Sequence, residues 1–270
     1  MPFALPDFLT DTMAAFLLVF FRMTGVVLVA PLLSNQGLPP RIRVWFAFML
    51  AAVAFPIVRG NTEEGAFAIL FRSEVSTVLA VGSEIAIGWA IGWTASIMIY
   101  VAQLAGHLIG QEIGLAVGEV FDPVSQTAAS PYANLYFTLG TLMFVVLNGH
   151  LALFEAVTRT FDVAPVGALL TITPATALLM AKEFGSEIYS LGVRLALPTI
   201  LALLLATVSM AILARAVPEM NIFIVGFSIR IAIGLAVVVI MVPFVIEYMI
   251  ELADLTGDFL ADVTATMGKG

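Results

Sequence analysis

The chain has 270 residues, of which 61% are hydrophobic and 11% charged, and its mean hydropathy is +1.08. Soluble domains are about 45–50% apolar and about 25% charged, so this composition predicts a polytopic membrane protein. The absence of cysteine excludes disulfides and thiolate metal sites. A net charge of −8 argues against nucleic acid as a partner. No Lys or Arg precedes the first apolar stretch, so we expect no cleavable signal peptide.

Six apolar segments follow one another along the chain, each near the roughly 20 residues that a helix needs to cross a bilayer. A helix satisfies its own backbone hydrogen bonds in lipid, so we expect all six to be helical. The predicted fold class is all-α, with about six long hydrophobic helices. The segments are 13–33, 42–58, 76–101, 132–154, 188–214 and 221–249.

Four charged residues lie within these apolar segments, away from the segment ends. A charge at the centre of a lipid-exposed helix costs about 2.5–3.5 kcal/mol on insertion scales, so each of them needs a partner or water. Three interpretations stay open: ion pairs between helices, a polar pathway, or helices that do not lie in lipid. The four residues are Arg22, Glu84, Arg194 and Arg230.

A ladder of glycines follows the third segment, within residues 106–123. Four residues turn a helix by about 400°, so glycines at this spacing stay on one slowly drifting face. Such a face lets another backbone come close, whereas Glu112 and Glu119 point away from it. Pro123 then stops the helix. The stretch is either a tightly packed membrane helix or a movable constriction. Its glycines are Gly106, Gly110, Gly114 and Gly118.

Two later stretches indicate how the C-terminal part is organised. Residues 155–187 hold prolines and a glycine among apolar residues, and we expect an irregular or re-entrant excursion and an internal boundary there. The apolar stretches 188–214 and 221–256 are separated by a turn with Pro218 and Asn221, which predicts a helical hairpin.

Acidic residues recur along one face of the last helix. Like charges three and four residues apart disfavour a helix by a few tenths of a kcal/mol per pair, roughly. The face is therefore either simply solvated or a docking strip for basic partners. The docking strip comprises Glu247, Glu251, Asp254 and Asp258, with Asp262 continuing it.

No sequence pattern indicates catalysis. The chain contains no P-loop, no HExxH and no GxSxG. His107 lacks a second pair of metal ligands, and His150 is interpreted as an interfacial or capping residue. We therefore expect no enzyme activity, no metal and no cofactor.

Four segments, taken in order, resemble the FliR/SctT family, the export-gate subunits of bacterial flagella and of virulence type III secretion. The resemblance runs from about residue 13 to about residue 256. Gly37, Pro39, the Asn148–His150 triplet and Gly226-Phe227 stand out within it. The segments are FRMTGVVLVAPLLSNQGLPPRIRV, GQEIGLAVGEVFDP, LNGHLALFEAV and NIFIVGFSIRIAIGL.

The resemblance implies one subunit of a protein-conducting gate in the bacterial inner membrane, at the flagellar basal body. Its partners would be FliP-like and FliQ-like gate subunits, FlhB-like and FlhA-like membrane components, and unfolded export substrates. A single copy of this chain would close the hetero-oligomer. Residues 1–180 would be the FliP-like part and residues 181–270 the FliQ-like hairpin.

The resemblance also assigns the glycine-rich stretch to the central plug of the pore. The flagellar and virulence branches share these motifs, so the motifs do not separate them; we take the flagellar branch as the leading assignment and the virulence branch as its alternative. A purely structural assembly subunit and a secondary transporter that uses the four buried charges stay as alternatives. The implied plug or hinge residues are Gly110, Ile113, Gly114, Leu115, Val117, Gly118, Val120 and Phe121.

Overall fold

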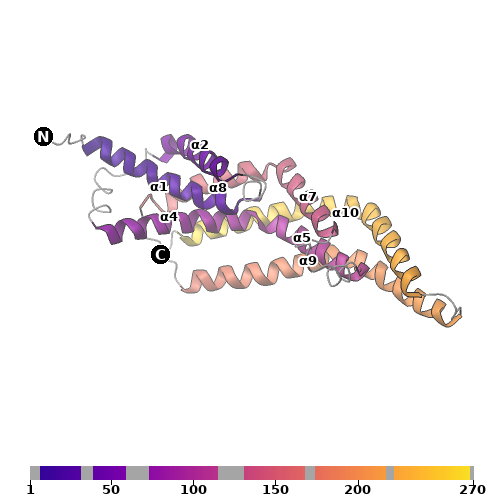
Figure 1. Cartoon of the computed structure of the whole chain (residues 1–270). Helices are drawn as coiled ribbons and strands as arrows, with labels where there is room; N and C mark the ends of the chain where they lie inside the picture. The colour runs from indigo at the N-terminus through magenta and orange to yellow at the C-terminus, as the bar shows by residue number, and fades with distance from the viewer. Residues whose placement is uncertain are drawn as a thin grey trace. The chain divides into compact units, whose positions relative to one another are not determined.

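The computed structural model describes residues 7–31, 39–58, 73–114, 131–167, 174–216 and 222–267, and every regular element in these ranges is an α-helix (Figure 1). This confirms the predicted all-α fold. The helices are α1 (Asp7–Val29), α2 (Pro40–Val58), α4 (Glu74–Ala95), α5 (Ile97–Ile113), α7 (Pro131–Val146), α8 (Gly149–Val163), α9 (Pro174–Ala216) and α10 (Ile222–Met267).

The number of apolar helices agrees with the prediction of about six. Among the described residues, five helices are long and apolar enough to cross a membrane, or six if the bent pair α7 and α8 counts as one span. A short break separates these two helices. It coincides with Asn148, whose φ of 58° is left-handed. Asparagine is one of the few residues that adopts this conformation readily, so Asn148 and the following Gly149 mark the break.

The prediction of an irregular excursion over residues 155–187 is wrong for most of that stretch. Helix α8 continues to Val163, and α9 already begins at Pro174. Proline is well tolerated in the first turn of a helix, where its missing N–H would have had no partner. Pro174 therefore starts a helix here and does not interrupt one. Non-helical backbone among the described residues of this stretch is confined to residues 164–167.

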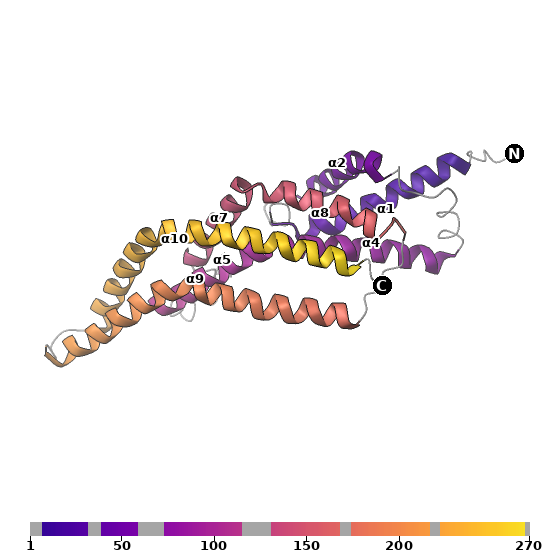
Figure 2. The ribbon, with the colours of Figure 1, turned by 180° about the vertical axis from the view of Figure 1, so that it is seen from behind.

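Helices α9 and α10 form the predicted C-terminal hairpin (Figures 1 and 2). Two contacts fix their antiparallel pairing. The Tyr248 hydroxyl donates to the Leu191 carbonyl oxygen at 3.2 Å. Gly226 faces Met210, since a methyl group added to Gly226, as in alanine, would lie 3.7 Å from Met210 Cε. Both helices extend well beyond the predicted apolar segments, to 43 and 46 residues.

The chain divides into two compact units with interleaved segments. Unit 1 comprises residues 1–96, 148–181 and 254–270, and unit 2 comprises residues 97–147 and 182–253. The boundary predicted between residues 180 and 181 separates a FliP-like part from a FliQ-like part. The two compact units do not test that likeness, so the boundary stays a prediction.

Within unit 1, helix α1 packs against both α2 and α4 (Figure 1). Helix α2 buries one row of mostly small residues. In the contact between α1 and α2, the ring centroids of Phe16 on α1 and Phe48 on α2 are 5.4 Å apart. The opposite face of α2 is apolar and exposed in the single chain, with Trp45 at 67% and Met49 at 66%. The inward row is Ala47, Ala51, Ala54 and Val58.

Candidate functional site

Helices α1 and α4 approach each other so closely that their backbones touch at glycines. A methyl group at Gly88 would overlap the carbonyl oxygen of Arg22 and lie 2.9 Å from the nitrogen of Val26. A methyl group at Gly25 would likewise overlap the carbonyl oxygen of Ile85. Glycine allows this approach because it has no Cβ. The close contact brings the side chains of the two helices into one buried layer.

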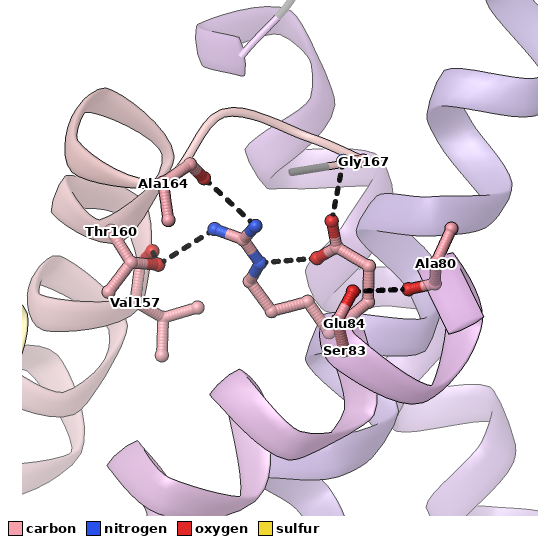
Figure 3. Close-up of polar contacts among 8 residues, drawn as sticks. Ala80, Ser83, Glu84, Val157, Thr160, Ala164 and Gly167 are labelled. Carbon is pink, nitrogen blue, oxygen red and sulfur yellow. Dashed lines mark hydrogen bonds and ion pairs between the residues drawn. The ribbon is translucent and has the colours of Figure 1, made fainter. Parts of the chain in front are cut away.

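Arg22 and Glu84 form an ion pair in this layer. Arg22 Nε donates to Glu84 Oε2 at 2.6 Å, and both side chains are fully buried. The other guanidinium nitrogens donate to Thr160 Oγ1 and to the Ala164 carbonyl oxygen, each at 3.0 Å (Figure 3). The Phe161 ring lies 4.0 Å from Arg22 Cζ and adds a cation–π contact.

The second carboxylate oxygen of Glu84 is hydrogen-bonded as well. Glu84 Oε1 accepts a hydrogen bond from the backbone N–H of Gly167 at 2.8 Å (Figure 3). Gly167 has a left-handed φ of 83°, which favours glycine at that position. The Thr160 hydroxyl donates to the Val157 carbonyl oxygen at 2.5 Å, which leaves its lone pairs for Arg22.

These groups form the Arg22 cluster, defined as Arg22, Glu84, Thr160, the Ala164 carbonyl and the Gly167 amide. The cluster joins α1, α4, α8 and residues 164–167 within unit 1. A buried charge is tolerated when it is paired and hydrogen-bonded, as both charges are here. With every side of the pair engaged and no exposed surface, the cluster suits a structural clamp and not proton transfer to a substrate.

The other two predicted buried charges are placed differently. Arg194 on α9 is exposed in the single chain, and Arg230 on α10 is partly buried. Both belong to unit 2. Within the described ranges, neither of them is in an ion pair, and the buried Nε of Arg230 has no hydrogen-bond acceptor there.

Among the described glycines of the ladder, Gly106 and Gly110 are helical. A methyl group at Gly106 would overlap the Tyr132 carbonyl oxygen and lie 2.8 Å from Ala133 Cα, so α5 and α7 touch through their backbones. Gly110 is buried in α5, and the helix ends at Ile113. Gly114 follows with a φ of 93°, a common way for a helix to end. The remaining plug residues Leu115, Val117, Gly118, Val120 and Phe121 lie outside the described residues.

The predicted docking strip lies along one exposed face of α10. Its members Glu247, Glu251, Asp254 and Asp258 are all exposed in the single chain. The opposite face of the same helix is buried at Val245, Met249 and Leu252. The strip is therefore available to solvent or to a partner.

Neither histidine lies in a group of metal ligands within the described part of the chain. His107 and Gln111 are exposed on α5, with their Nε2 atoms 3.1 Å apart. His150 is exposed in the first turn of α8, directly after the bend.

Sequence reasoning missed the partners that α8 contributes to the Arg22 cluster. Thr160 and Phe161 lie more than 130 residues from Arg22, and nothing in their local sequence marks them as its partners. The one available signal was the glycine pair at 25 and 88, because close packing of α1 and α4 forces the neighbouring charges together.

Comparison with known proteins assigns the family. The family described as "Bacterial export proteins, family 1" matches residues 13–255. The flagellar biosynthetic protein FliR of Escherichia coli (strain K12) is 28% identical over 91% of each chain. FliR of Bacillus subtilis (strain 168) is 24% identical over 96% of this chain and 97% of its own. The surface presentation of antigens protein SpaR of Shigella sonnei is 22% identical over 82% of each chain.

The match covers most of the chain, including α1, α4 and α8, which carry the Arg22 cluster. It also covers α5 and nearly all of the apolar hairpin. An export family is in keeping with the expectation from the sequence that the chain performs no covalent chemistry, and it confirms that prediction. The chain belongs to family 1 of the bacterial export proteins.

Proposed function

We propose that this chain is a subunit of the flagellar type III protein export gate in the bacterial inner membrane. The observation that carries the proposal is the family match over residues 13–255, together with FliR relatives aligned over about nine-tenths of the chain. The apolar helices supply a membrane-embedded body. In this role the chain forms the protein-conducting pore together with FliP-like and FliQ-like subunits.

The gate needs a closing element, and the stretch around the end of α5 suits it. Helix α5 is held against α7 at Gly106 and ends at Ile113, so the proposed plug starts from a fixed point. Gly110, Ile113 and Gly114 form the described base of the proposed plug, and the other members follow in residues 115–121.

The first experiment replaces the FliR of a motile bacterium with this chain. Export of a reporter fused to an early flagellar substrate, and recovery of the chain in the inner-membrane fraction with FliP and FliQ, support the gate. A chain that is purified alone from a membrane in which it is stably expressed contradicts it.

The plug is tested by shortening residues 115–121 and measuring ion leakage with a membrane-potential dye. The complex should be recovered at the normal level, whereas the resting potential should fall because the pore is no longer closed. Unchanged conductance in an assembled complex contradicts the plug and favours a purely structural assembly subunit.

The docking strip supplies a second contact to the proposed assembly. Glu251→Lys combined with Asp254→Lys reverses two exposed charges on α10 and should reduce recovery of the complex or docking of its basic partners. The neutral variant Glu251→Gln with Asp254→Asn is the matched control and should have a smaller effect. Normal recovery after charge reversal would reduce the strip to a solvated face.

The similarity to SpaR supports a second candidate, an export gate of the virulence branch. The replacement experiment separates the two candidates. Restored motility supports the flagellar branch, whereas secretion restored only in a strain lacking its SpaR supports the virulence branch.

A further inference from the structure

The last turn of α5 lies where three helices of unit 2 meet. Ile113 is fully buried there, and its side chain lies directly on the backbone of α10. A methyl group added at Gly234 would lie 2.6 Å from Ile113 Cδ1 and 3.0 Å from Ile113 Cγ1. Because ordinary carbon contacts are about 3.5–4.0 Å, a side chain at position 234 would require Ile113 to shift from its place.

Helix α7 closes the same junction from another side. Its backbone touches α5 at Gly106, next to Tyr132. Tyr132 itself is 8% exposed, and its hydroxyl oxygen would lie 3.5 Å from a methyl group at Gly234. Tyr132 therefore extends from α7 to α10 directly beside Ile113.

A second contact lies two turns earlier on α10. Phe227 and Gly234 are seven residues apart, which places them on one face of the helix. The Phe227 ring would lie 3.9 Å from a methyl group at Gly114, where the backbone leaves the helical conformation. Gly114 N–H donates to the Gln111 carbonyl oxygen at 3.0 Å and closes the last turn of α5. Helix α10 thus contacts the end of α5 over two of its own turns.

We propose that Gly234, together with Tyr132 and Phe227, positions the end of α5, so that the C-terminal hairpin sets the resting position of the gate. The proposal rests on the proposed function, since it assigns positioning residues to the plug base at Ile113 and Gly114. Residues 227–234 lie within the uninterrupted helix α10, so a displacement of this part of the hairpin is transmitted to Ile113 at the point of contact. A side chain at position 234 presses on Ile113 at the end of α5, while the sequence of the plug stays unchanged.

The test compares one substitution at two buried glycines of α10. Gly234→Ala places a methyl group against Ile113, whereas Gly226→Ala meets only Met210 Cε at an ordinary 3.7 Å. We expect a severalfold higher ion leak in Gly234→Ala, with normal recovery of the complex, and wild-type conductance in Gly226→Ala. The larger Gly234→Leu should leak more than Gly234→Ala.

A compensating change identifies the contact that matters. Ile113→Val removes the Cδ1 atom nearest to position 234 and should reduce the leak of Gly234→Ala towards the wild-type level. A merely destabilised helix would not be rescued in this way, because Ile113→Val removes packing. Equal leakage in the single and double variants overturns the proposal.

A cross-link tests the geometry independently of conductance. The chain has no cysteine, so Ile113→Cys with Gly234→Cys introduces the only two thiols. The Cβ at position 234 would lie 3.0 Å from the Cγ1 position of Ile113, which a sulfur can occupy, so oxidation should form a disulfide. If both thiols of the assembled complex still react with maleimide after oxidation, the proposal is overturned. This result does not depend on whether Gly234→Leu assembles.

The outcomes also separate this inference from the plug. If shortening residues 115–121 causes leakage and the Gly234 variants conduct as wild type, the plug stands and the positioning role of α10 fails. If neither change alters conductance in an assembled complex, the plug itself fails.

Discussion

Unit 1 and unit 2 hold their helices together by different kinds of contact. Both contain glycines that bring two backbones together, at Gly88 in unit 1 and at Gly106 in unit 2. Unit 1 adds the Arg22 cluster, in which two buried charges are fully engaged. Unit 2, over its described residues, has no buried ion pair and relies on the fit of Ile113 against Gly234.

Because of this difference, the two units should tolerate different substitutions. A steric contact fixes only the distance between two groups. When one group is enlarged, a neighbouring side chain can move by a few tenths of an ångström to accommodate it. A buried ion pair also sets directions, and removing one partner strands the other charge in an apolar environment. Unit 1 is therefore suited to be a rigid frame, whereas the junction in unit 2 is suited to small adjustments. The following predictions test this contrast.

The largest effect is expected from breaking the ion pair. Arg22→Met leaves Glu84 buried and unpaired, and should lower the free energy of unfolding by about 3–5 kcal/mol. Denaturant unfolding of the detergent-solubilised complex measures it. Adding Glu84→Leu should recover much of the loss, because no charge then remains buried. A single-variant loss below about 1 kcal/mol would show that the pair is not buried in the assembly.

A smaller effect is expected from removing one hydrogen bond of the cluster. Thr160→Val keeps the shape of the side chain and nearly the same helix propensity, but it removes the acceptor of one guanidinium N–H. Hydrogen bonds to charged groups contribute about 1.5–3 kcal/mol, and the loss should lie in that range. The same change at Thr138, exposed on α7, is the control and should be nearly neutral. Equal losses at the two positions would contradict the role of Thr160 in the cluster.

The steric contacts of the two units should respond alike. Gly88→Ala and Gly106→Ala each place a methyl group into a facing backbone carbonyl, and overpacking of this kind costs about 1–3 kcal/mol. Gly82→Ala on α4 is the matched control, since nothing lies within 4 Å of its added methyl group. It should raise helix stability by up to about 1 kcal/mol. Thermal unfolding of the three variants measures the comparison, and a destabilising Gly82→Ala would contradict it.

Much of this architecture could be predicted from the sequence because it depends on local pattern. Apolar length gave the helices, and the spacing of Gly106 and Gly110 indicated the close approach that α7 makes to α5. The buried positions of Arg22 and Glu84 followed from the cost of a charge in an apolar helix. Their pairing with each other was one of several possibilities, because four charges were candidates.

What could not be predicted depends on tertiary contacts. Thr160 and the Gly167 amide lie 138 and 83 residues from the charged groups that they bind, and they meet the ion pair only through the packing of unit 1. The contact between Gly234 and Ile113 joins residues 121 positions apart, one in the last apolar segment and one in the glycine-rich stretch. Neither Gly234 nor Tyr132 carries a local signal for that partner. Pro174 begins a helix, whereas a proline among apolar residues predicts a break.

The smallest effect is expected where a second ion pair of unit 1 lies in solvent. Arg159 and Glu155 are one turn apart on α8, with their closest atoms at 2.7 Å and side chains 71% and 63% exposed. Because water and salt screen this pair, Arg159→Ala should change the free energy of unfolding by no more than about 0.5 kcal/mol. The measurement is the same denaturant series used for Arg22→Met, at low and high salt. A loss comparable to that of Arg22→Met would mean that a partner subunit buries α8, and that the contrast between buried and exposed pairs holds only for the isolated chain.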